Sequence, residues 1–354
     1  MDILNSPEKI RETDPAGMYD KIYNFPEQLE KAVAIGTAIK PNLDYFSGIK
    51  TIIVAGMGGS AIGGDLVRSY LADKIKLPFH ICRHYRLPEF VNKDSLVVIS
   101  SYSGNTEETL SALDDAIRRG ARIACFTSGG KVAALAQKNG YLLTELPVGF
   151  PPRAALGFSF VPLLFLMAKL GFISSVERDV AELIKGLKIC REQYSANVET
   201  ENNPAKLLAN RLYKKIPIIY TGPELIDTVG TRWKGQICEN AKCLAFNNQF
   251  AEFNHNELVG WNVIDSYRSK IIVINLRDSD DHERIKRRME IVRTIIEKQG
   301  VEIVDVFSNG DFSMGRIFSL IQMGDFVSLY LAVLNNVDPT PVKVIDFLKG
   351  ELDK

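Results

Sequence analysis

The stretch Thr51–Asp65, TIIVAGMGGSAIGGD, constrains the fold of this 354-residue chain more than any other. Its first five residues are apolar and mostly β-branched, which indicates a buried strand, and a helix is expected from Ser60 onward. Five glycines fall between Gly56 and Gly64, where they permit positive φ angles and close approach of another backbone. A loop of this kind presents N–H groups and a helix N-terminus to an anion, so we predict a phosphate site. For one such loop alone, a tight turn that binds nothing is the alternative.

A second loop of similar chemistry follows the apolar strand predicted at Ser95–Ser101. Its sequence, SYSGNTEET, places the hydroxyls of Ser101, Ser103 and Thr106 just before a helical pattern at Glu107–Arg119. Hydroxyl groups donate to phosphate oxygens, although one of them must be discounted as a helix N-cap. Because the carboxyl ends of parallel strands meet at one edge of a sheet, the two loops are expected to converge on one crevice.

Strands and helices alternate from Thr51 onward, which is typical of a parallel sheet covered by helices on both faces. The second half has neither a glycine-rich loop nor a serine loop, so one phosphate site per chain is expected. The predicted organisation is an N-terminal helical segment packed on the first domain (1–50), a first α/β domain (51–173), a helical linker (174–204) and a second α/β domain (205–354).

The composition argues against several classes of partner. The 43 Lys and Arg residues balance 43 Asp and Glu residues, so no net charge favours nucleic acid or an anionic membrane surface. The longest apolar run, Gly157–Ala168, is too short for a bilayer, and the N-terminus lacks the apolar segment of a signal peptide. Five scattered cysteines without CxxC spacing favour reduced thiols over disulfides or a zinc site. We therefore expect a cytoplasmic protein that holds no metal.

Four charged side chains are candidates for chemistry. Arg153 lies in the proline-rich segment Leu146–Leu156, either as an ion-pair anchor or ligand group, or in a plain surface loop. Glu239, in GQICENAK, occupies a helix on which a carboxylate is most often solvated. His255, in NHNE, is a candidate acid or base, although a lone histidine is usually structural or solvated. Lys349, near the C-terminus, has the ordinary interpretation of a surface lysine.

Taken in order, the motifs GMGGSAIGGD, SYSGNTEET, PPRAAL, ENAK, NHNE and DPTPVKVIDFLK resemble the bifunctional phosphoglucose/phosphomannose isomerases. The resemblance implies two sugar isomerase (SIS) domains: an α/β fold of two αβα sandwiches with mainly parallel sheets, plus N-terminal helices. It also implies a homodimeric aldose–ketose isomerase without a cofactor. The substrates implied are fructose 6-phosphate, glucose 6-phosphate and mannose 6-phosphate, with a cis-enediolate intermediate. The residues that match the family's 6-phosphate site are Gly59, Ser60, Ser101, Ser103 and Thr106.

The resemblance further implies roles for the four charged candidates. Glu239 would be the base that moves a proton between C1 and C2, and Arg153 would steady the enediolate. His255 would assist ring opening from the partner subunit. Lys349 would lie near the ring oxygen or the first hydroxyl.

One position departs from the family pattern. In relatives, a threonine just before the last helix is tied to acceptance of mannose. Aligning on IDFLK puts Val342 there, with Thr340 two residues earlier, so tolerance at C2 is an open question.

The residues leave two other functions open. A SIS-type sensor would bind sugar phosphate through the serine loops without converting it, and would need none of the catalytic set. A nucleotide-dependent dehydrogenase is suggested by a GxGxxA pattern at Gly56–Ala61. A dehydrogenase of this kind needs an acidic residue after its second strand to bind the ribose hydroxyls. The predicted strand Phe79–Cys82 is followed by Arg83 instead, which argues against this function.

Overall fold

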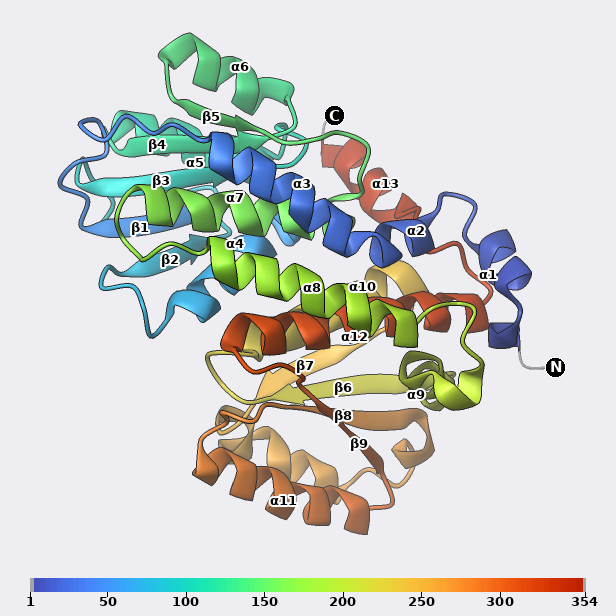
Figure 1. Cartoon of the computed structure of the whole chain (residues 1–354). Coiled ribbons are helices and arrows are strands. Elements are labelled where there is room, and N and C mark those ends of the chain that lie inside the picture. Colours follow the sequence, from blue (N-terminus) through green and yellow to red (C-terminus); the bar gives the residue numbers. More distant parts are fainter. Residues whose placement is uncertain (1–2, 353–354) are drawn as a thin grey trace. The chain divides into compact units, whose positions relative to one another are not determined.

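The structure is a computed structural model in which residues 3–352 are described (Figure 1). The chain divides into two compact units. The N-terminal unit comprises Asn24–Lys185, and the C-terminal unit comprises Gly186–Lys354 together with Met1–Tyr23. These units differ from the expected boundaries, because residues 1–23 group with the second half of the chain rather than with the first domain. The division falls within α8 (Glu177–Gln193), inside the segment interpreted as a linker.

The N-terminal unit contains a five-stranded sheet in the order β2-β1-β3-β4-β5, with every neighbouring pair parallel (Figure 1). The strand order reverses at β1, so that β2 lies on one side of it and β3 on the other. In open α/β sheets, ligands bind beyond the carboxyl ends of strands at such a switch point. The strands are β1 (Thr51–Ala55), β2 (Phe79–Cys82), β3 (Ser95–Ser100), β4 (Arg122–Thr127) and β5 (Leu142–Glu145).

Helices cover both faces of this sheet. On one face, Gly64 of α4 packs directly on Val54, and α4 and α3 both pack on α7. On the other face, Ile53, Val97 and Ile123 form a core with residues of α5 and α6. The helices of this unit are α3 (Phe25–Ala38), α4 (Gly58–Leu71), α5 (Glu107–Arg118), α6 (Gly130–Asn139) and α7 (Leu156–Lys169).

The C-terminal unit repeats this plan with four parallel strands in the order β7-β6-β8-β9. The pattern matches β2-β1-β3-β4 of the N-terminal unit, with β6 in the place of β1 and β8 in the place of β3. The strands are β6 (Ile216–Thr221), β7 (Phe246–Gln249), β8 (Ile271–Arg277) and β9 (Glu302–Phe307).

The longest helix of the C-terminal unit, α12, is a core helix. It is apolar enough to resemble a membrane span, but 94% of its most apolar window is buried, and it packs on α9 and α10. On the other side of the sheet, Met289 and Ile296 of α11 pack with Val273. The helices are α1 (Pro7–Thr13), α2 (Met18–Tyr23), α9 (Pro204–Leu212), α10 (Asp227–Ala241), α11 (Glu283–Lys298), α12 (Ser313–Leu334) and α13 (Lys343–Leu352).

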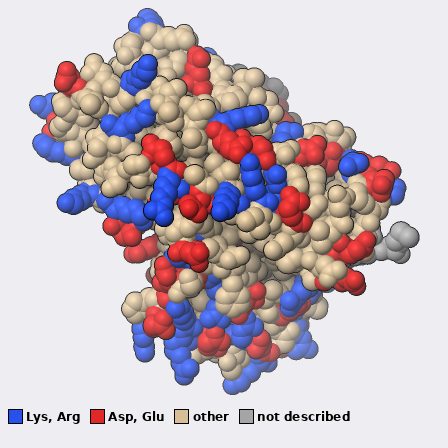
Figure 2. Space-filling view, in the orientation of Figure 1, with Lys and Arg blue, Asp and Glu red and all other residues tan. Residues whose placement is uncertain are grey.

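The predicted fold class is confirmed: both sheets are parallel and helices alternate with strands. Helix α4 begins at Gly58, two residues before the expected start. Strand β7 is an addition to the predicted strands, because FNNQ has only one apolar residue to indicate it. The proline-rich segment Leu146–Leu156 contains a 3-10 turn at Pro152–Ala154, since proline is tolerated in a first helical turn. Figure 2 shows acidic and basic side chains interspersed over the face in view.

Candidate functional site

The loops that follow β1 and β3 contact one another at the carboxyl edge of the N-terminal sheet. The backbone N–H of Tyr102 donates to Ser60 Oγ (3.0 Å), and Ser100 Oγ donates to the carbonyl of Ser60 (3.1 Å). Gly56 lies so close to β3 that a Cβ atom there would stand 2.7 Å from the carbonyl oxygen of Ser100. The two loops therefore meet at the topological switch point, as predicted.

The second loop is held in a tight turn by its own hydroxyl groups. The buried Ser101 Oγ donates to Thr106 Oγ1 (3.1 Å) and accepts from the N–H of Gly104 (3.2 Å). Gly104 has a φ of +71°, and a Cβ there would overlap the carbonyl oxygen of Gly129. Ser103 is exposed at the tip. Only glycine fits at position 104, and this turn points Ser103 to solvent while Ser101 braces the loop.

Two helix N-termini face this edge without side-chain caps. Met57 precedes α4 and Thr106 precedes α5, and neither side chain bonds to the first turn of its helix. Thr106 occupies the N-cap position of α5, but its hydroxyl accepts a hydrogen bond from Ser101 instead of capping the helix. First-turn N–H groups have no acceptor within their own helix, and the positive end of the helix dipole lies there. The arrangement suits a phosphate group.

Arg153 belongs to the same cluster. Its side chain is only 5% exposed, so the plain surface loop is excluded. Its backbone packs on Gly59: a Cβ at Gly59 would lie 2.5 Å from the carbonyl oxygen of Pro152 and 3.0 Å from the nitrogen of Arg153. A glycine at position 59 thus allows the arginine-bearing loop to reach the start of α4.

Gln28 of α3 fixes the C-terminal end of the arginine-bearing loop. This buried side chain donates to the carbonyl of Ala154 (2.7 Å) and accepts from the N–H of Gly157 (2.7 Å). The amide group of Gln28 therefore bridges the residues that follow Arg153. No sequence pattern indicates this role, because the partners of Gln28 lie more than 120 residues away in the chain.

Tyr102 ties the serine loop to the arginine-bearing segment. Its hydroxyl donates to the carbonyl of Pro147 (2.6 Å) and accepts from the N–H of Phe150 (3.1 Å). Burial raises the pKa of Tyr102, so the phenol stays protonated. Tyr102 was absent from the residues predicted for the site, although a tyrosine between two serines of a polar loop is the signal that it anchors the loop.

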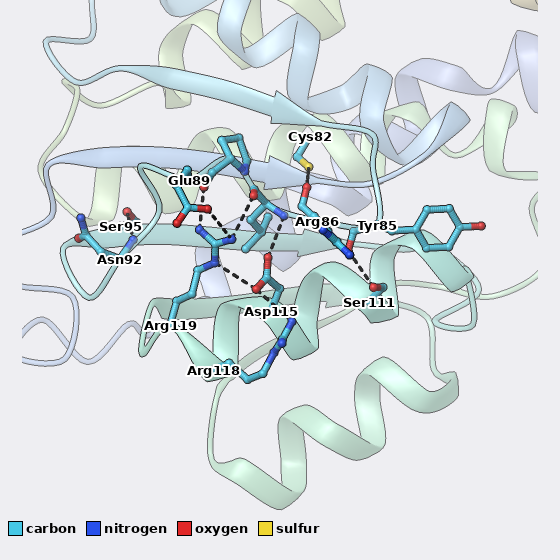
Figure 3. Close-up of polar contacts among 12 residues, drawn as sticks. Cys82, Tyr85, Arg86, Glu89, Asn92, Ser95, Ser111, Asp115, Arg118 and Arg119 are labelled. Carbon is cyan, nitrogen blue, oxygen red and sulfur yellow. Dashed lines mark hydrogen bonds and ion pairs between the residues drawn. The ribbon is translucent and has the colours of Figure 1, made fainter.

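Helix α5 is braced at its other end (Figure 3). Asp115 accepts from the N–H of Leu87 (3.0 Å), and Arg119 donates to the carbonyl of Pro88 (3.0 Å) and to Asp115 (3.0 Å). These bonds hold the segment after β2 against the helix whose first turn completes the serine loop. Arg119 and backbone bonding outweigh burial, so the pKa of Asp115 lies below its usual value and the network stays charged.

Glu239 lies in the last turn of α10 in the C-terminal unit, and this turn is firmly held. Asn240 Nδ2 donates to Ser328 Oγ (2.9 Å), and Asn335 Nδ2 donates to the carbonyl of Ala241 (2.9 Å). Lys242 Nζ donates to the carbonyls of Glu239 (2.5 Å) and Pro339 (3.0 Å).

A buried polar row anchors the rest of α10 on α12. Arg232 pairs with Asp325 (2.7 Å), and Gln236 donates to the other oxygen of the same carboxylate (2.8 Å). The helix that carries Glu239 is therefore fixed along its length.

A cavity of about 580 Å³ adjoins Glu239 in this unit. Its other walls are the end of α10 and the start of α13, and Val342 lines it whereas Thr340 does not. Glu239 is partly buried in the wall of this cavity.

The structure does not bring His255 or Lys349 to the cavity that Glu239 lines. His255 is exposed at the end of a 3-10 turn, Glu252–His255, whose Phe253 is buried against Tyr220. Lys349 is exposed on α13. The phosphate-loop residues and Arg153 belong to the N-terminal unit, and the other three candidates belong to the C-terminal unit.

Comparisons with known proteins place the chain in a family. Residues 201–352 match the bacterial phospho-glucose isomerase C-terminal SIS domain. The chain is 46% identical over 335 residues to a bifunctional phosphoglucose/phosphomannose isomerase of Caldicellulosiruptor bescii, covering 95% of this chain and 98% of that relative. A bifunctional phosphoglucose/phosphomannose isomerase of Aquifex aeolicus is 38% identical over 306 residues, covering 86% and 91%.

The fold also has solved counterparts. A hypothetical protein from Thermus thermophilus superposes with a TM-score of 0.74 at 16% identity, covering 97% of this chain and 93% of that one. At that identity the likeness supports the fold alone, whereas the two relatives above extend over nearly the whole sequence. The chain belongs to the bifunctional phosphoglucose/phosphomannose isomerase family.

Proposed function

We propose that this protein is an aldose–ketose isomerase that interconverts fructose 6-phosphate with glucose 6-phosphate and with mannose 6-phosphate. One observation carries the proposal: two serine- and glycine-rich loops meet at the switch point of a parallel sheet, with a buried arginine loop packed on them. The names of the two similar relatives agree with this activity. Residues 51–173 and 205–354 would be the two SIS domains, joined by the helical segment 174–204.

Phosphate binding is the first role we assign. Gly59, Ser60, Ser101, Ser103 and Thr106 surround the uncapped starts of α4 and α5, where N–H groups and hydroxyls suit a dianion. Binding energy from this non-reacting end of the sugar would order the open chain for reaction.

Proton transfer is the second role. Glu239 takes the proton from C2 of the open-chain aldose, which leaves a cis-enediolate, and returns a proton to C1 to give the ketose. The negative charge that develops on oxygen requires a nearby cation, and Arg153 has that role in the proposal. This chemistry requires neither a metal nor a redox cofactor.

His255 and Lys349 have proposed roles at the sugar ring. His255, exposed and outside the Glu239 cavity, would assist ring opening in the partner subunit of a homodimer. Lys349 would act near the ring oxygen. We propose a soluble, cytoplasmic dimer without nucleic-acid or membrane partners.

The test of the proposed function is a coupled assay of glucose 6-phosphate formation from fructose 6-phosphate. Turnover should fall by about 10²–10⁴-fold in Glu239→Gln, because the general base is lost. Binding of fructose 6-phosphate should persist. The matched control is Glu182→Gln, an exposed carboxylate on α8, which should behave as the wild type. Full activity in Glu239→Gln would remove Glu239 from the mechanism.

Two further measurements, of fructose 6-phosphate binding and of NADPH fluorescence, separate the alternatives. A sensor would bind fructose 6-phosphate in the wild-type protein without forming any aldose. A dehydrogenase would quench NADPH fluorescence on mixing, whereas an isomerase of this kind would leave it unchanged.

Hybrid dimers test where His255 acts. Suppose that each site takes Glu239 from one subunit and His255 from the other, and that Glu239→Gln and His255→Ala chains are co-expressed and pair at random. About half of the dimers are then hybrids with one intact site each, so about a quarter of wild-type activity returns. If His255 serves its own chain, every hybrid site lacks one group and no activity returns.

A further inference from the structure

Two cysteines flank the proposed base. Cys238 precedes Glu239 on α10, and Cys243 follows the end of the helix. Lys242 adopts the left-handed conformation, with a φ of 54°, and so reverses the chain. The reversal lies between the two cysteines, which are five positions apart in the chain.

The thiols also share surroundings. Both cysteines are partly buried and line the cavity that Glu239 lines. The Cys243 thiol donates to the carbonyls of Lys215 (3.5 Å) and Leu244 (3.4 Å). Burial and the neighbouring Cys238 raise the pKa of Cys243, so the thiol is held protonated within electrostatic reach of its neighbour. Both cysteines therefore line one cavity, on either side of Glu239 in the chain.

We propose that Cys238 and Cys243 form a redox-modification site that closes to an intramolecular disulfide and switches off chemistry at Glu239. The effect on turnover rests on the proposed function, whereas the disulfide itself does not. The oxidant is a small-molecule disulfide. The thiolate of Cys238 attacks it and releases one thiol, and Cys243 then displaces the second thiol and passes on its proton. One reagent S–S bond is replaced by one protein S–S bond.

The cross-link would disturb the turn that positions Glu239. A disulfide requires its two Cα atoms to lie about 4.4–6.8 Å apart, so the bond constrains the last turn of α10. That turn is held by α12 and the segment after it: Asn240 donates to Ser328, the carbonyl of Ala241 accepts from Asn335, and Lys242 donates to the carbonyl of Pro339. The phosphate loops lie in the N-terminal unit, which holds neither cysteine. Oxidation should therefore lower kcat and leave binding of inorganic phosphate unchanged.

The test treats the full-length protein with oxidised glutathione, maps the disulfides by mass spectrometry and measures isomerase activity before and after dithiothreitol. We expect a Cys238–Cys243 disulfide and a fall in kcat of about 10- to 100-fold, as for a small misplacement of a catalytic group. Dithiothreitol should restore activity. Cys238→Ser and Cys243→Ser, each compared with its own reduced state, should lose the sensitivity. Cys190→Ser, a partly buried cysteine of the same unit, should keep it.

Separate glutathione adducts on the two thiols, or a mapped disulfide with unchanged kcat, would overturn the proposal. Failure of the proposed function has a different signature. In that case the reduced protein has no isomerase activity, and the mapped disulfide alone decides whether the dithiol site exists.

Discussion

The carboxyl edges of the two parallel sheets share a strand order but carry opposite chemistry. In the N-terminal unit, the loops after β1 and β3 present hydroxyls and helix N-termini. In the C-terminal unit, the loop after β8 presents Asp278, Asp280 and Asp281. Asp278 is buried, accepts from Ser308 Oγ (2.7 Å) and is paired with Arg316 (3.1 Å).

At the end of β6, a carboxylate also fills part of the second edge. The carboxylate of Asp281 fills the space over Gly222, at the end of β6, and accepts from the N–H of Asp278 (2.9 Å). A phosphate there would meet carboxylates where the first edge offers donors. The comparison teaches that two edges of the same topology carry different loop chemistry, and we expect that chemistry to decide whether an anion binds. One phosphate site per chain stays a prediction.

The largest effect on substrate binding should come from placing a carboxylate at the carboxyl edge of the N-terminal sheet, as the C-terminal sheet has at its own edge. In Ser103→Asp, an exposed carboxylate would face the bound phosphate. Like charges in contact cost several kcal/mol, so the KM for fructose 6-phosphate should rise by about 10²–10³-fold. Steady-state kinetics measure the change. Ser279→Asp, at an exposed serine of the second edge, is the control and should leave KM unchanged. An equal response in both variants would break the comparison.

A smaller effect is expected from pushing the arginine-bearing loop away from α4. Gly59→Ala places a methyl group 2.5 Å from the carbonyl of Pro152, so the loop must shift. We expect kcat to fall by about 10- to 100-fold, with about 1–3 kcal/mol lost from the free energy of unfolding. Gly235→Ala on α10, where a Cβ meets no atom within 4 Å, is the matched control. Normal kcat in Gly59→Ala would show that the Arg153 loop does not serve the site.

Gln28→Leu tests the support of the same loop from α3. The substitution leaves the carbonyl of Ala154 and the N–H of Gly157 without their partner, at a cost of about 2–4 kcal/mol in the free energy of unfolding. We expect kcat to fall by about tenfold, because Arg153 loses its fixed position while the phosphate loops remain intact. Chemical denaturation and kinetics at 25 °C provide both numbers. A rise in KM with unchanged kcat would contradict a role through Arg153.

The smallest effect concerns the pH dependence of the second edge. Burial raises the pKa of Asp281 from 3.8 to about 6. The folded state then binds a proton that the unfolded state has lost, so the free energy of unfolding should fall as pH rises from about 4 to about 6. Urea denaturation should show a smaller fall in Asp281→Asn and an unchanged fall in Asp311→Asn, at an exposed aspartate. An identical slope in all three proteins would contradict a buried carboxylate at this edge.

Prediction from the sequence succeeded for local structure. The order of strand, glycine or serine loop and helix start was predictable, because neighbouring residues encode it. Gln28 acts through contacts with the segment around Arg153 that no local pattern reveals, and the place of Tyr102 between two serines marks the residue but not its partners Pro147 and Phe150. Whether Arg153 was buried depended on the same packing. The grouping of residues 1–23 with the C-terminal unit depends on contacts between α12 and the N-terminal helices, which are also distant in sequence.

The most direct test is a calorimetric titration of the Glu239→Gln protein with fructose 6-phosphate, alone and combined with Ser103→Asp or Ser279→Asp. Our account predicts one ligand bound per chain, binding lost with Ser103→Asp and binding unchanged with Ser279→Asp. Two ligands per chain, or binding that survives Ser103→Asp, would contradict the assignment of the phosphate to the N-terminal edge.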